Sequence, residues 1–468
     1  MYRRTTALYL VIQAVLTSAV LDPRQDPSVL LVCTQIASSI SSASSVSYPC
    51  TADDLGTILQ ILGNTRTPFA VKGGGHIMNP NYSSTTGVQI AMSRFDEIDY
   101  EASTSTVAVG AGNIWDNVYE ALMPYNVNVV GGRVSGIGVA GFILGGGYSW
   151  LTNQYGLTLD NVLAYELVLP NGTITTVSVS SNPDLFFGLR GGYNNFGIVT
   201  TFTLATYPQG LVWGGQIAYT GDNVDALNIA TANFANNVTD PKAAIITTLD
   251  YTLGSIIASV LMFYDAPTQP VGIFDEFLAI PALCTNVASR PFLDLVQVEP
   301  TNETANFRGY YNTVPLVEIT DGIMNAVLDQ AEASTFKHWG SALSGDCSAS
   351  IISYDVEPFL PSILTHGSAS AYPYARTQPF LPLNIYFSWI SSSEDPTMHD
   401  AIVQSATNLT NVATAEGQSL TSAPHYPNYA IYSTSLEEIY GTALPEMYAL
   451  KATYDPDNVM SLSGGWMV

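Results

Sequence analysis

Residues 71–76 of the chain read VKGGGH, and this motif begins at the end of Phe69–Val71, a short apolar stretch that we predict to be a β-strand. Three consecutive glycines allow backbone conformations that other residues cannot adopt. The successive N–H groups of such a loop form a concave nest that suits a pyrophosphate. His76 follows the nest immediately, so we expect its ring beside the molecule to which the phosphates belong. The alternative is a glycine turn with an incidental histidine.

A second glycine-rich stretch lies at residues 131–147, which read GGRVSGIGVAGFILGGG. It contains one literal G-x-G-x-x-G, at Gly136, Gly138 and Gly141, after a predicted strand at Asn126–Val130. A Rossmann unit would need an uninterrupted helix after this motif. Three more glycines follow soon after Gly141, and each costs a helix about 1 kcal/mol relative to alanine. The context therefore argues against a Rossmann unit.

Two further motifs lie later in the chain. Residues 182–200 read NPDLFFGLRGGYNNFGIVT, which predicts a helix that runs into glycines and then into an apolar strand. The tail contains YPNY at residues 426–429, a predicted helix at Glu437–Lys451, and turn residues at 455–458 that end this helix. We therefore expect a compact tail.

The pattern of predicted strands and helices divides the chain into three regions. In residues 28–207, short predicted strands alternate with helices, and Pro170–Thr173 predicts a hairpin turn. Residues 208–424 predict an antiparallel sheet with helices on one face, and residues 425–468 form the tail. The predicted strands are Phe69–Val71, Val88–Ala91, Thr106–Val109, Val162–Val168, Ile198–Leu204, Ala244–Leu249, Ile256–Phe263 and Asn384–Ile390, and the predicted helices of these two regions include Trp115–Met123, Asn223–Ala235 and Thr320–Glu332.

The charge balance of the chain is strongly acidic. Charged residues make up only 11% of the 468 residues, and 39 Asp and Glu oppose 14 Lys and Arg, for a net charge of −25. Such a surface repels nucleic acid and anionic membranes, so neither is an expected partner. It is typical of an extracellular protein that works at mildly acidic pH.

Residues 1–19 are predicted to be a secretory signal peptide. Arg3 and Arg4 precede an apolar run at Ala7–Val15, and Thr17–Ala19 supplies small residues for cleavage. The run is too short to cross a membrane, and no other stretch of the sequence reaches about 18 uninterrupted apolar residues. We therefore expect a secreted protein whose mature chain is soluble.

Four cysteines and five glycosylation sequons agree with secretion. We predict a disulfide between Cys33 and Cys50 across the first helix, whereas Cys284 and Cys347 either pair or stay as buried thiols. No CxxC pair is present, so no metal site is expected. The sequons, which also arise by chance in a chain rich in Ser and Thr, begin at Asn81, Asn171, Asn237, Asn302 and Asn408.

Taken together and in this order, the motifs resemble those of the vanillyl-alcohol-oxidase-type flavoproteins, and in particular the berberine-bridge-enzyme-like group in its fungal secreted form. The runs GGGH, LGGGYSWLTNQYGLTLDNV and NPDLFFGLRGGYNNFGIVT carry the resemblance, which spans roughly residues 45–207 and 424–462. It implies an α+β fold with a PCMH-type FAD-binding domain of two α+β subdomains at residues 20–207. An antiparallel-sheet α+β substrate domain would follow at 208–424, and a C-terminal segment at 425–468 would return to the first domain.

The resemblance also implies that FAD is the cofactor. His76 matches the histidine that bonds to the 8α-methyl carbon of the flavin, whereas Val134 stands where many relatives carry a cysteine that forms a second bond. Attachment is therefore expected through His76 alone. Ile137 stands near the side from which O₂ reaches the flavin in the family. The other residues that the resemblance places around FAD are Val71, Lys72, Gly73, Gly74, Gly75, Ile77, Gly132, Gly136, Gly138, Gly141, Tyr155, Gly156, Leu157, Gly197, Ile198, Val199 and Asn428.

The activity that the resemblance implies is hydride transfer from a small organic substrate to N5 of the flavin. Reoxidation by O₂ would give H₂O₂, so an oxidase is favoured over a dehydrogenase. The preferred substrate is an intermediate of fungal secondary metabolism; the alternatives are a carbohydrate or oligosaccharide oxidase, and a flavin-scaffolded cyclase with little net redox turnover. Tyr426 is the expected base that takes the proton of the substrate, with His366 and Tyr386 as further candidates.

Overall fold

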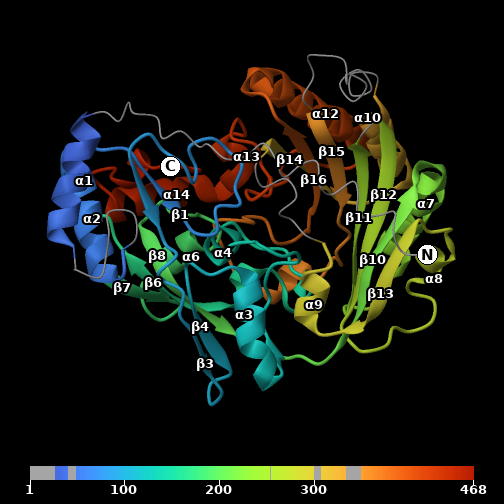
Figure 1. The fold of residues 1–468 in the computed structure, drawn as a ribbon, viewed down its shortest axis with the longest axis horizontal. Coiled ribbons are helices and arrows are strands. Elements are labelled where there is room, and N and C mark those ends of the chain that lie inside the picture. Colours follow the sequence, from blue (N-terminus) through green and yellow to red (C-terminus); the bar gives the residue numbers. More distant parts are fainter. Residues whose placement is uncertain (1–26, 41–48, 253, 300–306, 334–348) are drawn as a thin grey trace, which may run out of the picture.

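The computed structural model describes residues 27–40, 49–252, 254–299, 307–333 and 349–468. Figure 1 shows two halves side by side, one built around a five-stranded sheet and the other around a seven-stranded sheet. Helices cover both halves, and both sheets are antiparallel. The protein therefore has the α+β fold that the sequence predicts.

The first half contains the five-stranded sheet and a parallel pair of strands. The sheet has the order β3 (Ile98–Glu101), β4 (Thr106–Gly110), β8 (Ile198–Ala205), β6 (Val162–Val168) and β7 (Ile174–Ser178). The parallel pair is β1 (Phe69–Lys72) with β2 (Val88–Ala91), and a short pair joins β5 (Val127–Asn128) to β9 (Tyr207–Pro208). The predicted strands at Val88–Ala91 and Val162–Val168 agree with the structure residue for residue, whereas the predicted strand at Asn126–Val130 shrinks to β5.

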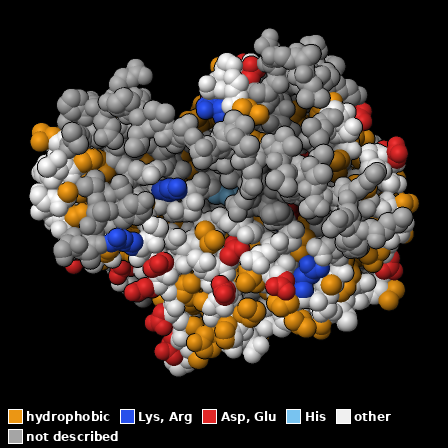
Figure 2. All heavy atoms as spheres, in the orientation of Figure 1, with side chains coloured by type: hydrophobic (Ala, Val, Ile, Leu, Met, Phe, Trp, Pro, Cys, Tyr) orange, Lys and Arg blue, Asp and Glu red, His pale blue; other side chains and the backbone are white. Residues whose placement is uncertain are grey.

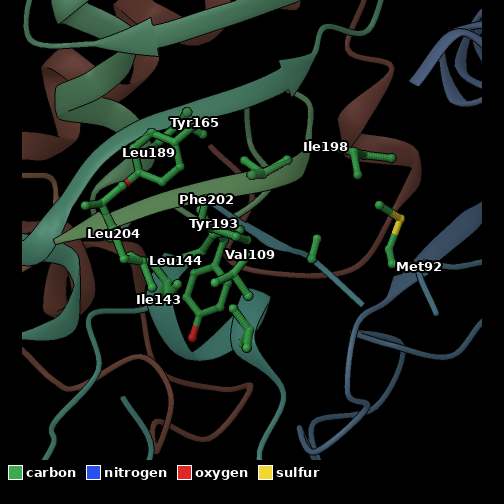
Figure 3. Close-up of a cluster of buried hydrophobic side chains, with 14 of the residues drawn as sticks. Met92, Val109, Ile143, Leu144, Tyr165, Leu189, Tyr193, Ile198, Phe202 and Leu204 are labelled. Atoms are coloured by element: carbon green, nitrogen blue, oxygen red, sulfur yellow. The ribbon is translucent and has the colours of Figure 1, made fainter. Parts of the chain in front are cut away.

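Apolar side chains of this sheet form the core of the first half. Alternate residues of β8 and β6 point to the same side, so Phe202 and Leu204 pack with Tyr165. Figure 3 shows this cluster, in which Ile143 and Leu144 of α4 (Val139–Leu144) approach the sheet from below. Helix α4 is only six residues long and ends at glycines, as expected for a motif that is not a Rossmann unit.

The second half contains the seven-stranded antiparallel sheet. Its order is β13 (Cys284–Arg290), β10 (Val212–Thr220), β12 (Ser255–Tyr264), β11 (Ala243–Thr252), β15 (Ala349–Val356), β16 (Leu381–Trp389) and β14 (Arg308–Leu316). One face packs against α7 (Val224–Asn237), α10 (Asp321–Glu332) and α12 (Asp395–Ala415), which lie on the outer side of the sheet in Figure 1.

The other face of this sheet turns toward the first half. On β11, Ile245 and Leu249 pack into the core beneath the helices, whereas Thr248 and Asp250 point the opposite way and line a cavity. This alternation follows from the period of two residues in a strand. The polar residues of the central strands are therefore gathered on the inner face.

The tail packs against the first half. Lys451 donates from Nζ to the carbonyl oxygen of Asn195, and the Asn195 amide donates to the carbonyl oxygen of Trp466. The single helix predicted at Glu437–Lys451 is wrong, because the chain forms α13 (Leu436–Tyr440) and α14 (Leu444–Tyr454) instead. The break lies at Gly441, which has φ +42°.

The remaining elements connect the two halves and cover their ends. They are α1 (Pro27–Ser39), α2 (Ala52–Thr65), α3 (Trp115–Leu122), α5 (Thr152–Tyr155), α6 (Pro183–Leu189), α8 (Asp275–Ala279) and α9 (Phe292–Val296), with 3₁₀ helices η1 (Met123–Tyr125), η2 (Thr158–Asn161), η3 (Gly221–Asn223), η5 (Ile363–His366), η6 (Ser392–Glu394), η7 (Gly441–Ala443) and η8 (Met460–Leu462). In the described part of the chain, no helix combines the length and the apolar character that crossing a membrane requires.

Several predictions about secretion fall partly outside the described residues. The predicted leader at 1–19, Asn302 and Cys347 lie there. Cys33 and Cys50 are not bonded to each other in the structure, and the Cys50 sulfur accepts a hydrogen bond from Arg94. Their pairing therefore stays a prediction.

A buried ion cluster ties η2 of the first half to the segment that follows η5. The carboxylate of Asp160, which has no exposed surface, accepts hydrogen bonds at 2.7 Å from both Arg190 and Arg376. Arg190 is itself buried and also donates to the hydroxyl of Ser368. Removal of the carboxylate would leave two guanidinium groups without their counter-charge.

We predict that Asp160→Asn lowers the free energy of unfolding by about 3–5 kcal/mol, because breaking a buried ion pair leaves an uncompensated charge. Denaturant unfolding followed by circular dichroism measures the change. Asp99→Asn is the control, because Asp99 is exposed on β3. A loss below about 1 kcal/mol would contradict the central role of Asp160.

Candidate active site

A cavity of about 1340 Å³ lies between the two halves. The glycine-rich loops of the first half form one wall, the inner face of the seven-stranded sheet forms the opposite wall, and the 426–429 segment of the tail closes part of it. On the outer surface, acidic side chains gather on the lower part of the face shown in Figure 2, among apolar and uncharged side chains.

The VKGGGH loop and the second glycine stretch touch each other at this wall. A Cβ atom added at Gly74 would lie 2.5 Å from the Cα atom of Gly138, so neither position has room for a side chain. Within the described residues, the N–H groups of Gly73, Gly74 and Gly75 have no hydrogen-bond acceptor. The loop therefore presents free donors at the edge of a cavity, as an anion-binding nest does.

His76 lies at the end of this loop and lines the cavity. Its ring stacks on Tyr311 of β14, with ring centroids 6.1 Å apart and an angle of 11° between the planes. Burial lowers the pKa of His76 below its ordinary value. The imidazole is therefore neutral near pH 7, which leaves one ring nitrogen with a lone pair.

The cavity has room for a large cofactor along the glycine wall. A Cβ atom added at Gly141 on α4 would meet no atom within 4 Å, so the cavity is open in front of this residue. Open space, free N–H donors and a neutral imidazole fit a dinucleotide such as FAD. The predicted cofactor residues that line the cavity are Val71, Gly73, Gly74, Gly75, His76, Ile77, Val134, Gly136, Gly138, Gly141, Ile198, Val199 and Asn428.

Six other predicted cofactor residues do not line the cavity. One is Lys72, whose exposed side chain lies over Gly75. Gly132 packs against the indole of Trp115, and Gly197 packs against the backbone of Val168. These two glycines are small enough to let the residues of the wall pack closely.

The Tyr155–Leu157 segment also lies away from the cavity. Tyr155 stacks on Tyr207 at a centroid distance of 3.8 Å, and Leu157 is fully buried in a separate apolar cluster. Gly156 approaches His366, which is exposed at the end of η5 and does not line the cavity. The expectation that His366 lies near the flavin is therefore corrected, because η5 packs on the outside of this segment.

The sheet wall carries a closed triangle of polar groups that the sequence did not reveal. Arg133 forms an ion pair with Glu357 at 2.7 Å and donates to the hydroxyl of Tyr429 at 2.9 Å. The Tyr429 hydroxyl donates in turn to Glu357 Oε1 at 2.9 Å. All three side chains line the cavity, and both charged groups are buried. The triangle joins the glycine wall, the sheet and the tail.

Burial raises the pKa of Glu357 to about 7, although the charge of Arg133 opposes this shift. Burial also raises the pKa of Tyr429, and the nearby charge of Glu357 adds to the effect. A carboxyl group with a pKa near 7 can exchange a proton at neutral pH. The Tyr429–Glu357 pair therefore has the composition of an acid–base centre.

Tyr426, the predicted base, also lines the cavity. Its hydroxyl accepts hydrogen bonds from the backbone N–H of Gly147 at 3.2 Å and from the Asn428 amide at 2.9 Å. Asn428 also accepts a hydrogen bond from the hydroxyl of Tyr193. Burial raises the pKa of Tyr426 to about 12. Tyr426 thus accepts from two donors, and no carboxylate of the described residues is hydrogen-bonded to its hydroxyl to take up a proton.

Tyr386, the third candidate, lies on β16 with its ring 5.0 Å from that of Tyr311. Sequence reasoning missed Asp355 and Glu357, although a signal was present. Around β15, polar Ser353, Asp355 and Glu357 alternate with the buried residues Ile352, Tyr354 and Val356. Such alternation indicates a strand with one polar face, and the antiparallel sheet turns that face inward.

Comparisons with known proteins identify the family. Residues 43–178 match the model of the FAD binding domain. The chain is 35% identical over 365 residues to an uncharacterized FAD-linked oxidoreductase of Arthroderma benhamiae, an alignment that covers 75% of this chain and 71% of that protein. It is 29% identical over 423 residues to the FAD-dependent monooxygenase tpcD of Cochliobolus heterostrophus, covering 87% of this chain and 81% of that protein.

Solved structures share the fold. The 6-hydroxy-D-nicotine oxidase of Arthrobacter nicotinovorans superposes with a TM-score of 0.72 at 18% identity, covering 89% of this chain and 90% of that one. Berberine bridge enzyme in complex with (S)-reticuline superposes with a TM-score of 0.73 at 15% identity, covering 95% of this chain and 99% of that one. The chain belongs to the FAD-linked oxidoreductases, and it shares the fold of the solved berberine-bridge-enzyme-like structures. It is an FAD-dependent enzyme, which confirms the resemblance read from the motifs.

The open space at Gly141 generates a test of the cofactor wall. We predict that Gly141→Ala keeps or raises the stability of the flavin-free protein by up to about 1 kcal/mol, because alanine favours a helix. The same change should lower the FAD content of the purified protein, because the new methyl group enters the cavity.

Thermal unfolding of the flavin-free protein and the ratio of flavin to protein absorbance measure the two effects. Gly210→Ala is the matched control, since a Cβ atom there also meets no atom within 4 Å and Gly210 does not line the cavity. An unchanged FAD content in Gly141→Ala would contradict this position of the cofactor.

Proposed function

We propose that the protein is a secreted oxidase that holds FAD covalently through His76 and oxidises a small organic substrate, with O₂ as the electron acceptor. The position of His76 at the edge of the large cavity, directly after the free N–H donors of Gly73–Gly75, carries the proposal. When bound, FAD accepts a hydride from the substrate and passes the electrons on. Val134 has no thiol, so His76 is the one point of attachment proposed.

The glycine wall would hold the cofactor, and the opposite wall would handle the proton of the substrate. Oxidation of an alcohol or amine carbon requires the loss of a proton from its heteroatom. We infer that Tyr429 Oη takes this proton while its own proton passes to Glu357 Oε1, along the hydrogen bond of 2.9 Å. Arg133 would hold both groups in place through its contacts at 2.7 and 2.9 Å.

Tyr426 takes a different part in this proposal from the one expected. Its hydroxyl accepts from Gly147 and Asn428, so it would orient the cavity wall beside the reaction rather than carry a proton away. A small secondary metabolite is the preferred substrate. Oxidation of an oligosaccharide and cyclisation without net redox turnover are the alternatives that experiment would separate.

Secretion and glycosylation also belong to the proposal. Asn81, Asn171 and Asn237 are exposed, which suits an attached glycan. Asn408 is half-buried and its amide donates to Gln330, so a glycan there would cost this hydrogen bond. We expect modification at the three exposed sequons first.

We predict that the tryptic peptide containing His76 carries an added FAD mass in protein from a eukaryotic secretory host. His76→Ala should lose this mass and retain at most dissociable flavin. His366→Ala, at an exposed site off the cavity, should keep the mass unchanged. Mass spectrometry after acid precipitation measures both variants. A flavin-carrying peptide in His76→Ala would assign the attachment to another residue.

We predict that Tyr429→Phe slows anaerobic flavin bleaching by about 10²–10⁴-fold, because a positioned acid–base group typically contributes this much. The probes are a panel of secondary alcohols, amines and oligosaccharides, with H₂O₂ release measured in parallel. Glu357 works as a base only when ionised, so the rate should rise with pH through about 7 and level off above it. Glu357→Gln should remove that step from the profile.

Tyr426→Phe is the comparison variant and should lose less rate than Tyr429→Phe. The opposite order would make Tyr426 the base. Turnover of glucose- or cellobiose-type sugars above every other probe would replace the preferred substrate class with carbohydrates.

A further inference from the structure

A second polar group lines the sheet wall beside the Tyr429–Glu357 pair. Asp355 on β15 accepts hydrogen bonds from the hydroxyl of Thr248 on β11 at 2.8 Å and from the amide of Asn384 on β16 at 2.9 Å. Asp250 on β11 lies diagonally across the same strand pair, because Thr248 opposes Asp355 and Asp250 opposes Ser353 in the register. Diagonal neighbours in a sheet are roughly 7–8 Å apart. All five side chains line the cavity.

Neither aspartate forms an ion pair with a basic side chain within the described ranges, although the charge of Arg133 acts on Asp355. The basic side chains on the cavity wall are His76, Arg133 and Arg308. Arg133 is bound to Glu357, and Arg308 forms an ion pair with Asp395. No described Lys, Arg or His forms an ion pair with Asp250 or Asp355, both of which keep partly exposed surfaces toward the cavity.

Asn384 gives an independent indication that this part of the wall binds a ligand. Its side chain is only 4% exposed and its Nδ2 atom donates to Asp355, but its Oδ1 atom has no hydrogen-bond partner among the described residues. Buried acceptors of this kind are normally satisfied. Because Asp355 and Asn384 both present acceptor atoms here, the partner that fits is a hydrogen-bond donor.

Aromatic rings border the same place. Tyr386 follows Asn384 by two residues on β16 and pairs with Tyr311 on β14, with ring centroids 5.0 Å apart. The faces of such rings attract cations. Carboxylates, an amide oxygen and tyrosine faces together suit an organic cation better than a neutral hydroxyl-bearing molecule.

We propose that this wall is a subsite for a positively charged nitrogen of the substrate, which docks against Asp250 and Asp355 at a distance from the carbon that is oxidised. The inference rests on the proposed function, since it places the docked group in the same cavity as the acid–base pair. The substrate class is therefore a small organic molecule that carries a basic amine, which is protonated and donates N–H hydrogen bonds.

Electrostatics support the subsite. Burial and the neighbouring charge of Asp355 raise the pKa of Asp250 to about 7, against the hydrogen bond from Ser353. Burial likewise raises the pKa of Asp355, against the hydrogen bonds from Thr248 and Asn384 and the charge of Arg133. A bound cation would offset the repulsion between the two carboxylates. The net charge of −25 would also draw cations toward the protein.

The test uses the flavin-loaded protein and two probes of the same shape, the N–H-bearing cation benzamidinium and its neutral isostere α-methylstyrene. Dissociation constants come from the flavin difference spectrum and from protein fluorescence. We expect the cation to bind at least about tenfold more tightly than its neutral isostere, and to weaken as salt is added. Asp250→Asn and Asp355→Asn should each weaken cation binding by about five- to tenfold, and neither should change binding of the neutral probe.

Asp99→Asn is the matched control, because it removes the same charge from an exposed site on β3, and it should leave both constants within about twofold. Equal binding of the two probes would overturn the subsite, as would cation binding that neither aspartate variant weakens. Tighter binding of a cellobiose-type oligosaccharide that both variants weaken would also overturn it. Flavin content and bleaching by dithionite are read separately, so a failure of the FAD assignment is distinguishable from a failure of the subsite.

Discussion

The site depends on the contact between the backbones of Gly74 and Gly138. A single added methyl group at either position would lie within about 2.6 Å of the other residue, so neither position can carry a side chain while the two loops stay in contact. This contact joins a loop that follows β1 to the loop that precedes α4. The two loops form one continuous wall, along which lie the free N–H groups of the first loop and the open space before Gly141.

The opposite wall depends on charge rather than on backbone contact. Arg133 extends from the same glycine stretch, crosses to the sheet, and meets Glu357 at 2.7 Å. Tyr429 of the tail completes the triangle, so three distant parts of the chain meet in one buried network. A buried network is favourable only when every member is satisfied. The return of the tail to the first half is therefore needed for the site as well as for the fold.

The parts of the structure that the sequence predicted are those with a local physical cause. Glycine runs mark close approach, and alternation marks the strands, so β2 and β6 agree residue for residue with their predictions. The Tyr429–Glu357 contact joins residues 72 positions apart and has no local signature. The break at Gly441 was missed because one glycine among helix-forming residues is weak evidence until its φ of +42° is known. His366 was misplaced because nothing in its neighbours reveals on which side of a segment η5 packs.

The acidic wall also has a cost for the folded state. The folded pKa of Asp250 lies near 7 against an ordinary value of 3.8, and that of Glu357 lies near 7 against 4.5. Between these values Asp250 and Glu357 bind more protons in the folded protein than in the unfolded chain, so their contribution to the free energy of unfolding falls as pH rises from about 4 to about 7. Hence these two carboxyl groups destabilise the folded protein most above about pH 7, where they are ionised and can accept a proton. Groups kept in such an environment are typical of functional sites, and a cation bound between the aspartates would recover part of that stability by favouring their ionised form.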